Sequence, residues 1–245
     1  MINNKEVLIF KNSDQRVESA IKKWTEIADA AIKQRGLFTV ALSGGSTPVT
    51  LYKELSGTDL KWDNTHIFIV DERFVPFDHR DSNYRMINET LLSNINIPEQ
   101  NIHPVPTGKG SADESARSYE RDLQSFFNLS FGGIPEFDLV VLGLGEDGHT
   151  ASLFPGSTTL ADNDHLVLSA ASPDRSGHER ITMTFPLINN SRNILFLVTG
   201  SNKAEVVKDV LENIDCTLPS ANVKPIKGML YFLLDSKAAS LLTKH

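Results

Sequence analysis

Short apolar runs alternate with amphipathic segments along the chain, and this alternation predicts its secondary structure. The apolar runs are rich in β-branched and aromatic residues, which is typical of buried strands. We expect strands at residues 7–10, 38–42, 66–70, 137–142, 166–170, 194–198 and 229–234. Between them, apolar residues recur at steps of three and four, as in an amphipathic helix. We expect helices at residues 17–32, 48–55, 86–92, 112–126 and 204–211. A last helix would be capped by Ser236.

The order of these elements predicts the fold class. Strands alternate with helices throughout, which favours an α/β fold with a doubly wound, mainly parallel sheet and helices on both faces. Residues 181–187 fit less well and indicate an edge strand or a short crossover. The sequence contains no repeat, low-complexity tract or linker, so we expect a single domain over residues 1–245.

Composition narrows the classes of function. The net charge of −7 argues against a nucleic-acid partner, because such proteins usually present a basic face. No apolar window is long enough to span a membrane, and the first residues lack the pattern of a signal peptide. Cys216 is the only cysteine, which excludes an internal disulfide. We therefore expect a cytoplasmic protein with no membrane partner, while monomer and dimer both remain open.

The loop after residues 137–142 carries the most concentrated chemistry. Its sequence GLGEDGHT places Asp147 and His149 just beyond the carboxyl end of a buried strand, where open α/β sheets bind ligands. The loop also matches G-x-G-x-x-G, the dinucleotide fingerprint. Glu146 and Asp147 would put negative charge where a pyrophosphate must lie, so we reject NAD binding. Taken alone, Asp147 could equally be a helix cap and His149 a surface histidine.

A second loop, SGGSTP, follows the strand at residues 38–42. Glycines permit a tight turn, Pro48 suits the first position of a helix, and free backbone N–H groups then converge at the helix N-terminus. The residues that would form this anion site are Ser43, Gly44, Gly45, Ser46 and Thr47. The alternative is a plain strand-to-helix turn with a hydroxyl cap.

Two further strand ends carry polar residues. Asp71, Glu72 and Arg73 follow the strand at residues 66–70, and Lys203 lies in GSNK after residues 194–198. Arg180 ends a polar stretch, residues 172–180, that we interpret as a loop. Because the carboxyl ends of parallel strands share one edge of a sheet, these groups could line one crevice.

Metal binding and covalent catalysis find no support in the sequence. No His/Cys spacing of the zinc type occurs, and no activated serine or cysteine is evident, so we expect no metal. His79 to Asp81 resembles a solvated loop, and His178 a structural or surface residue.

Together the motifs resemble the 6-phosphogluconolactonase family. The segments that carry the resemblance occur in the family's order and are LSGGSTP, VDERFVP, DSNYR, FDLVVLGLGEDGHTASLFPG, RITMTFPLIN, LVTGSNKA and LPSANVKP. The wider family includes glucosamine-6-phosphate deaminase, which is similar in several of these segments. The resemblance implies a Rossmann-like fold and the cofactor-free hydrolysis of 6-phospho-D-glucono-1,5-lactone, a small phosphosugar, in the oxidative pentose phosphate pathway.

The resemblance also implies roles for the candidate residues. His149 would be the general base, a task that suits an imidazole with its reference pKa near ~6.5. Asp147 or Asp71 would orient the ring or the sugar hydroxyls, and Arg73 would stabilise the oxyanion. The SGGST loop, with Lys203 and Arg180, would hold the phosphate.

Two alternatives stay open beside the lactonase. In the deaminase a Glu lies five residues after the DGH histidine, and here that position is Phe154. The lack of this acid argues against the deaminase. A sugar-phosphate sensing domain would keep the phosphate loop but could dispense with Asp147 and His149, whose presence together favours an enzyme.

Overall fold

Seven parallel strands form the large sheet in the computed structural model, which describes residues 4–130, 132–173 and 177–243. The strand order is β1-β10-β9-β6-β2-β3-β5, and every neighbouring pair is parallel. The strands are β1 (Lys5–Phe10), β2 (Phe38–Leu42), β3 (Thr65–Ile69), β5 (Ile102–His103), β6 (Leu139–Leu142), β9 (Asn193–Val198) and β10 (Met229–Asp235). All seven coincide with predicted apolar runs except the short edge strand β5.

Helices connect the strands, as the alternating pattern predicts. They are α1 (Ser13–Arg35), α2 (Ser46–Ser56), α3 (Asn83–Thr90), α4 (Ala112–Phe126), α5 (Phe185–Asn189) and α6 (Ala204–Glu212). Single 3-10 turns lie at Trp62–Asn64, Leu92–Asn94, Glu99–Asn101, Thr158–Ala161, Ser201–Lys203 and Pro219–Asn222. None of the helices in the described ranges is long and apolar enough to cross a membrane.

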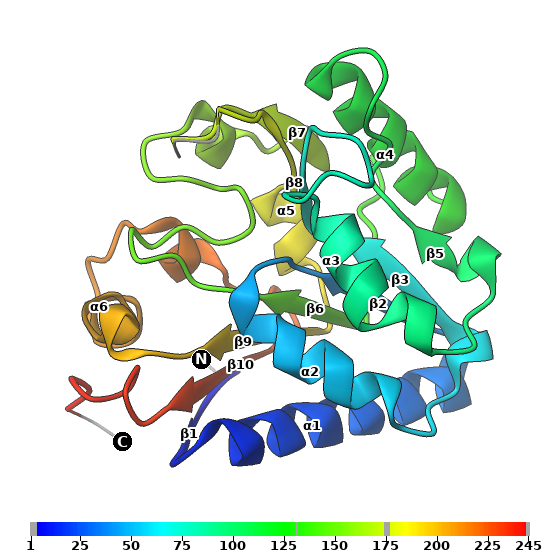
Figure 1. Ribbon diagram of the computed structural model, residues 1–245. Helices are drawn as coiled ribbons and strands as arrows, with labels where there is room; N and C mark the ends of the chain where they lie inside the picture. The colour runs from blue at the N-terminus through cyan, green and yellow to red at the C-terminus, as the bar shows by residue number, and fades with distance from the viewer. Residues whose placement is uncertain (1–3, 131, 174–176, 244–245) are drawn as a thin grey trace.

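Helices cover both faces of the large sheet (Figure 1). The Trp24 ring of α1 packs edge-on against Phe38, and Phe126 of α4 packs edge-on against Phe68. Phe38 is paired in register with Thr65, three positions before Phe68. Because strand side chains alternate between faces, Phe38 and Phe68 point to opposite sides. Burial of apolar side chains on both faces explains why these strands are almost continuously hydrophobic.

A second, three-stranded sheet departs from the single sheet that the sequence predicts. It consists of β4 (Asp71–Arg73), β8 (Arg180–Met183) and β7 (Val167–Ala170), paired antiparallel in that order. The polar strand end at residues 71–73 forms β4. Residues 181–183, expected as an edge strand or a short crossover, form the central strand β8 of this small sheet together with Arg180, the one residue of β8 that we interpreted as part of a loop. β4 has too few apolar residues to be recognised as a strand, and its partner β8 lies more than a hundred positions away in sequence.

Helix ends show where local rules hold and where they fail. Gly36 ends α1 with φ 82°, and Ser111 and Glu114 form a full capping box on α4, as predicted. α2 begins at Ser46, two residues before the predicted start. Proline is tolerated there because first-turn N–H groups have no partner within the helix. The predicted last helix is wrong: turns follow β10, and Asp235, not Ser236, accepts the Ala238 N–H at 2.7 Å.

Candidate active site

The loops that follow four adjacent parallel strands of the large sheet all begin at the same edge of that sheet. In the order β9, β6, β2 and β3 these strands precede the GSNK, GEDGHT, SGGST and DER segments. The Ser43 N–H donates to Val141 O at 3.2 Å, which joins the end of β2 to β6. After β2 the chain proceeds through β3 to β5 and then returns to the other side of β2 as β6. The order of strands therefore reverses between β2 and β6, the position at which open α/β sheets bind ligands.

The loop after β6 holds Asp147 and His149 as a tight pair. Asp147 Oδ1 lies 2.5 Å from His149 Nδ1 and also accepts the His149 backbone N–H at 3.1 Å. The backbone of the loop closes on itself through a Gly145 N–H to His149 O bond of 2.8 Å. Gly148 adopts φ 83° within this turn, a conformation that favours glycine. The imidazole is thus fixed both by its ring and by its main chain.

Gly145 is required by the pair rather than by its own dihedral angles. A β-carbon at this position would collide with Nδ1 of His149 and Oδ1 of Asp147. Two positions earlier, a β-carbon on Gly143 would meet nothing within 4 Å. The first glycine of the apparent dinucleotide motif is therefore sterically replaceable, and the second makes room for the imidazole and carboxylate.

The electrostatics of the pair fix which nitrogen of His149 is available. A carboxylate only accepts hydrogen bonds, so in the neutral form of the ring Nδ1 carries the proton and Nε2 carries the lone pair. Burial alone would raise the pKa of Asp147, but hydrogen bonds from the His149 backbone and ring, and the charge on that ring, hold it below its ordinary value. Asp147 therefore stays ionised at neutral pH. This acid, and not Asp71, contacts His149.

Phe154 covers the imidazole. Its ring centroid lies 4.9 Å from that of His149, and the side chain is buried. An apolar ring thus lies against the candidate base.

The loop after β9 lies beside the His149 loop. Asn202 Nδ2 donates to Glu146 Oε1 at 2.6 Å. Burial lowers the pKa of Lys203, and the carboxylates of Glu146 and Asp147 offset part of that shift. Asp235 at the end of β10 anchors the loop through the Thr199 hydroxyl at 2.5 Å. The ammonium group predicted to hold a phosphate is therefore close to the candidate acid–base pair.

The loop after β2 has donors that its own residues do not satisfy. Gly45, with φ 99°, precedes α2, and no side chain caps the helix N-terminus. The Ser43 hydroxyl is buried and has no hydrogen-bond partner among the described residues. A β-carbon on Gly44 would collide with the Asn83 amide. The alternative of a turn with a hydroxyl cap is therefore wrong, and the anion site of Ser43, Gly44, Gly45, Ser46 and Thr47 stays a prediction.

The acidic residues of the DER segment form hydrogen bonds that stabilise the fold. Asp71 is buried and accepts the Ser152 hydroxyl at 2.8 Å. Glu72 accepts the backbone N–H groups of Arg73, Asn83 and Tyr84 and caps α3. Burial raises the pKa of Glu72, and these hydrogen bonds oppose the shift. The roles of Glu72, Asn83 and Ser152 do not follow from the sequence, because their partners lie in other segments.

Arg73 and Arg180 lie opposite each other on paired strands. The two residues are register partners between β4 and β8. Arg73 Nη1 donates to Asp81 O at 2.6 Å, while its buried Nε has no partner within the described part of the chain. Arg180 is a buried strand residue, not a loop residue as predicted, and Nη2 donates to the Ser172 hydroxyl at 3.3 Å.

Comparison with known proteins relates this arrangement to a family. The model of the family described as glucosamine-6-phosphate isomerases/6-phosphogluconolactonase matches residues 11–232. The chain is 40% identical over 239 residues to 6-phosphogluconolactonase of Synechocystis sp., covering 97% of this chain and 98% of that protein. It is 43% identical over 217 residues to the Nostoc sp. protein of the same name, covering 88% and 89%.

Solved structures agree with the sequence comparison. The structure of 6-phosphogluconolactonase from Trypanosoma brucei superposes with a TM-score of 0.88 at 31% identity, covering 98% of this chain and 99% of that one. A monomeric glucosamine-6-phosphate deaminase shares the fold, with a TM-score of 0.80 at 23% identity over 97% of this chain and 100% of that one. On the extent of these matches, the chain belongs to the glucosamine-6-phosphate isomerase/6-phosphogluconolactonase family.

Proposed function

We propose that this chain is a 6-phosphogluconolactonase, which hydrolyses 6-phospho-D-glucono-1,5-lactone to 6-phospho-D-gluconate in the oxidative pentose phosphate pathway. Relatives that match nearly the whole chain carry this name. The observation that carries the proposal is the imidazole of His149, whose Nδ1 lies 2.5 Å from Asp147, in the loop after β6, while the uncapped N-terminus of α2 follows the neighbouring strand β2 at the same edge of the sheet. The imidazole is suited to act as a general base, and the helix N-terminus is suited to bind a phosphate.

The proposed reaction begins at Nε2 of His149. This nitrogen takes a proton from water while the water oxygen forms a bond to the lactone carbonyl carbon. The carbonyl oxygen becomes an oxyanion. When the tetrahedral intermediate collapses, the ring C–O bond breaks and the proton on Nε2 passes to the leaving ring oxygen. Asp147 stabilises the imidazolium that forms between these two transfers, as a paired carboxylate does in catalytic triads.

Two residues of the DER segment complete the proposed carbonyl site. We assign the oxyanion to Arg73, whose buried Nε finds no acceptor within the described ranges. Asp71 holds Ser152 with one carboxylate oxygen, and we assign the other to the sugar hydroxyls.

The phosphate is assigned to the turn before α2. Backbone N–H groups of Gly44 to Thr47 and the hydroxyl of Ser43 supply neutral donors at a helix N-terminus. Lys203 supplies a positive charge beside the Asp147 loop, and Arg180 a second from β8. This local charge offsets the overall negative charge of the protein. With one cysteine and a sugar-phosphate substrate, we assign the activity to the cytoplasm.

Phe154 favours the lactonase over the deaminase within this family. An amine-to-ketone conversion with ring opening needs a further acid–base group, and Phe154 offers only an apolar ring against His149. An activated ester already carries a good electrophile, so one base and one oxyanion donor suffice.

A single assay with two channels tests the proposal. Freshly generated 6-phosphogluconolactone is added and acid release is followed against the spontaneous rate, while glucosamine 6-phosphate is supplied in parallel and ammonia is measured. We expect acceleration of lactone hydrolysis and no ammonia. Ammonia release without lactone hydrolysis would identify a deaminase, and neither activity would favour a sensing domain.

A further inference from the structure

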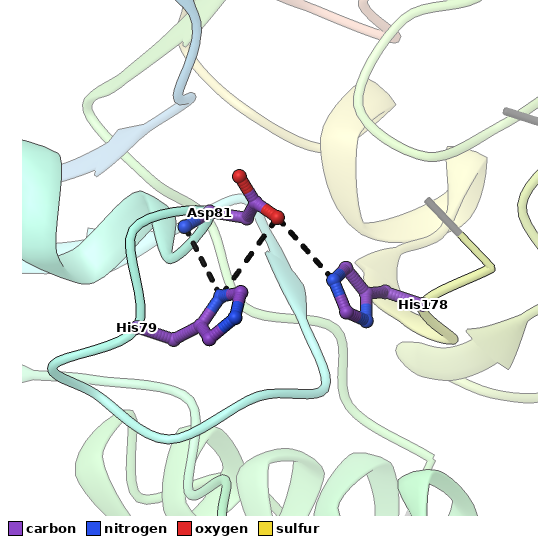
Figure 2. A group of neighbouring side chains, drawn as sticks. All are labelled: His79, Asp81 and His178. Atoms are coloured by element: carbon purple, nitrogen blue, oxygen red, sulfur yellow. Dashed lines mark hydrogen bonds and ion pairs between the residues drawn. The ribbon is translucent and has the colours of Figure 1, made fainter. Parts of the chain in front are cut away.

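Three side chains converge in a cluster outside the proposed active site. His79 and Asp81 lie in the turn before α3, and His178 lies just before β8. Asp81 Oδ2 lies 3.3 Å from His178 Nε2 and 3.8 Å from His79 Nδ1, so one carboxylate oxygen lies between two imidazoles (Figure 2). We propose that these residues bind a divalent transition-metal ion of the zinc class.

The spacing of the three donors fits such an ion. Zinc binds imidazole nitrogen at about 2.0–2.1 Å and carboxylate oxygen at about 2.0–2.2 Å, which places tetrahedral ligands about 3.3–3.5 Å apart. One donor atom from each residue lies within 4.8 Å of the other two. The two measured distances from Asp81 are therefore at or slightly above the required separation. Small side-chain rotations, rather than a rearrangement of the backbone, would complete the geometry.

The chemistry of the donor set favours zinc over magnesium or calcium. Two imidazoles and one carboxylate are preferred by zinc, copper and nickel, whereas magnesium and calcium prefer oxygen alone. The Asp81 N–H donates to Nδ1 of His79 at 3.2 Å, so the lone pair is already on that nitrogen. The ion would replace this hydrogen bond and the proton of His178 Nε2, which leaves for solvent. Arg80 approaches the other oxygen of Asp81, Oδ1, at 3.6 Å, which leaves Oδ2 to the ion.

The cluster is open enough to receive the ion. The side chains of His79, Asp81 and His178 are 36%, 34% and 29% exposed, respectively. Three protein ligands would leave the fourth position to water, as in open zinc sites. Two nearby arginines bond to backbone oxygens and leave Asp81 Oδ2 to the ion: Arg85 Nη1 donates to Asp78 O, and Arg73 Nη1 to the backbone oxygen of Asp81.

Binding would join two parts of the chain that are 97 residues apart. Asp81 is bonded through its backbone to Arg73, and Arg73 is paired with Arg180, two residues after His178. The ion would therefore bridge the turn before α3 to the start of β8 and stabilise the second sheet. Its role is structural, and it takes no part in the proposed hydrolysis.

A second histidine–aspartate pair provides the matched control. His165 Nδ1 lies 2.9 Å from Asp162 Oδ2 on the surface, closer than either contact of Asp81 in the cluster. No third histidine, cysteine or carboxylate joins that pair among the residues that the structure describes. If a histidine beside a carboxylate were sufficient, both places would bind zinc equally.

Isothermal titration of the full chain with zinc chloride, after treatment with a chelator, tests the proposal. We expect one equivalent to bind and the thermal midpoint to rise with zinc. His178→Gln and His79→Gln should each weaken binding tenfold or more, since even outer-shell changes at metal sites cost 10–100-fold. His165→Gln should change nothing.

Three outcomes would overturn the site. The first is that the wild-type chain fails to bind zinc. The second is that His178→Gln and His79→Gln bind zinc as tightly as wild type. The third is that only His149→Gln abolishes binding, which would place the ion at the Asp147 pair. Thermal unfolding without zinc identifies any variant that has lost its fold, in which case the other histidine variant decides. Because the readout is binding, the result does not depend on the proposed hydrolase activity.

Discussion

The two edges of the large sheet use aspartate in opposite ways. At the amino-terminal edge, Asp138 accepts the Thr39 backbone N–H at 2.9 Å and its hydroxyl at 3.1 Å, and it pairs with Arg35 and Arg192. Its side chain is 3% exposed. At the carboxyl-terminal edge, Asp147 is bonded to His149 alone among the side chains that the structure describes, and it is 47% exposed.

The difference separates structural charge from charge that is available to a ligand. Both carboxylate oxygens of Asp138 contact protein donors, so neither is available to bind a ligand. A cavity of about 600 Å³ lies at this edge, lined in part by Arg35, Glu136, Asp138 and Arg192, and these four charged groups are paired with one another. At the other edge, Ser43 Oγ and Arg73 Nε lack partners within the described ranges. Function is expected at the edge where donors are left over.

Replacement of Asp138 tests the structural half of this comparison and should give the largest effect. Asp138→Ala leaves two arginines and the Thr39 N–H without their acceptor. We expect a loss of about 3 kcal/mol in the free energy of unfolding, the lower end for a broken buried pair because the arginines are partly exposed. Urea denaturation measures the loss. The matched variant Asp147→Ala should change stability by less than about 0.5 kcal/mol, and equal losses would contradict the comparison.

Replacement of His149 tests the functional half. We expect His149→Ala to lower kcat for lactone hydrolysis by ~10² or more, equivalent to about 2.7 kcal/mol, because the proposed base is removed. The free energy of unfolding should stay close to that of wild type. His165→Ala, which removes the histidine of a different surface histidine–aspartate pair, should leave kcat unchanged. Unchanged turnover in His149→Ala would remove this residue from the mechanism.

The two glycines of the loop after β6 sharpen the comparison by geometry alone. In Gly145→Ala the new methyl group collides with the His149 ring, which must move away from Asp147. We expect kcat to fall about tenfold, since small displacements of a catalytic group have large costs. In Gly143→Ala the methyl group meets nothing within 4 Å, and kcat should be retained. Steady-state kinetics of both variants on the lactone decides, and equal rates would contradict a need for the fixed ring.

Local patterns predict the large sheet because its strands are buried on both faces. The run Phe38–Leu42 is fully buried and coincides with its strand end to end. The capping box at Ser111 and the Gly36 cap are equally local, and both are confirmed. β4 was not predicted, because three polar residues become a strand only through pairing with distant β8. The predicted last helix was wrong. The Asp235 carboxylate accepts hydrogen bonds from Thr199 and Gly200, distant in sequence, as well as from the Ala238 N–H.

The candidate site divides in the same way. The sequence places Asp147, His149 and Ser43 at strand ends, and the parallel order of strands brings those ends to one edge. It left open which acid contacts His149, since that depends on a side-chain rotamer within the turn. The cluster of His79, Asp81 and His178 could not be predicted from the sequence, because only tertiary structure brings His178 to Asp81, 97 positions away.

The histidines beside the edge strand β5 provide the smallest predicted effect. His103 stacks on Phe68 with ring centroids 4.0 Å apart, and its Nε2 lies 3.1 Å from Nδ1 of His66. Burial, and secondarily the charge on His66, lowers the pKa of His103 from 6.5 to about 4. Burial also lowers the pKa of His66. Both rings are therefore held neutral, and neither has a role in the proposed chemistry.

This shift has a definite sign for stability. Between pH 6.5 and about 4 the unfolded chain binds a proton at His103 that the folded chain does not, so stability falls as the pH is lowered through this window. We expect His103→Phe, which keeps the stacked ring and cannot titrate, to lose less stability than wild type between pH 7.5 and pH 5. The difference should be about 1 kcal/mol, after the shift is halved for solvent screening of a partly exposed group. Urea denaturation at both pH values measures it. Identical pH dependence in the two proteins would show that the His103 imidazole is freely hydrated. The contrast between structural and functional groups would then not extend to the histidines beside β5.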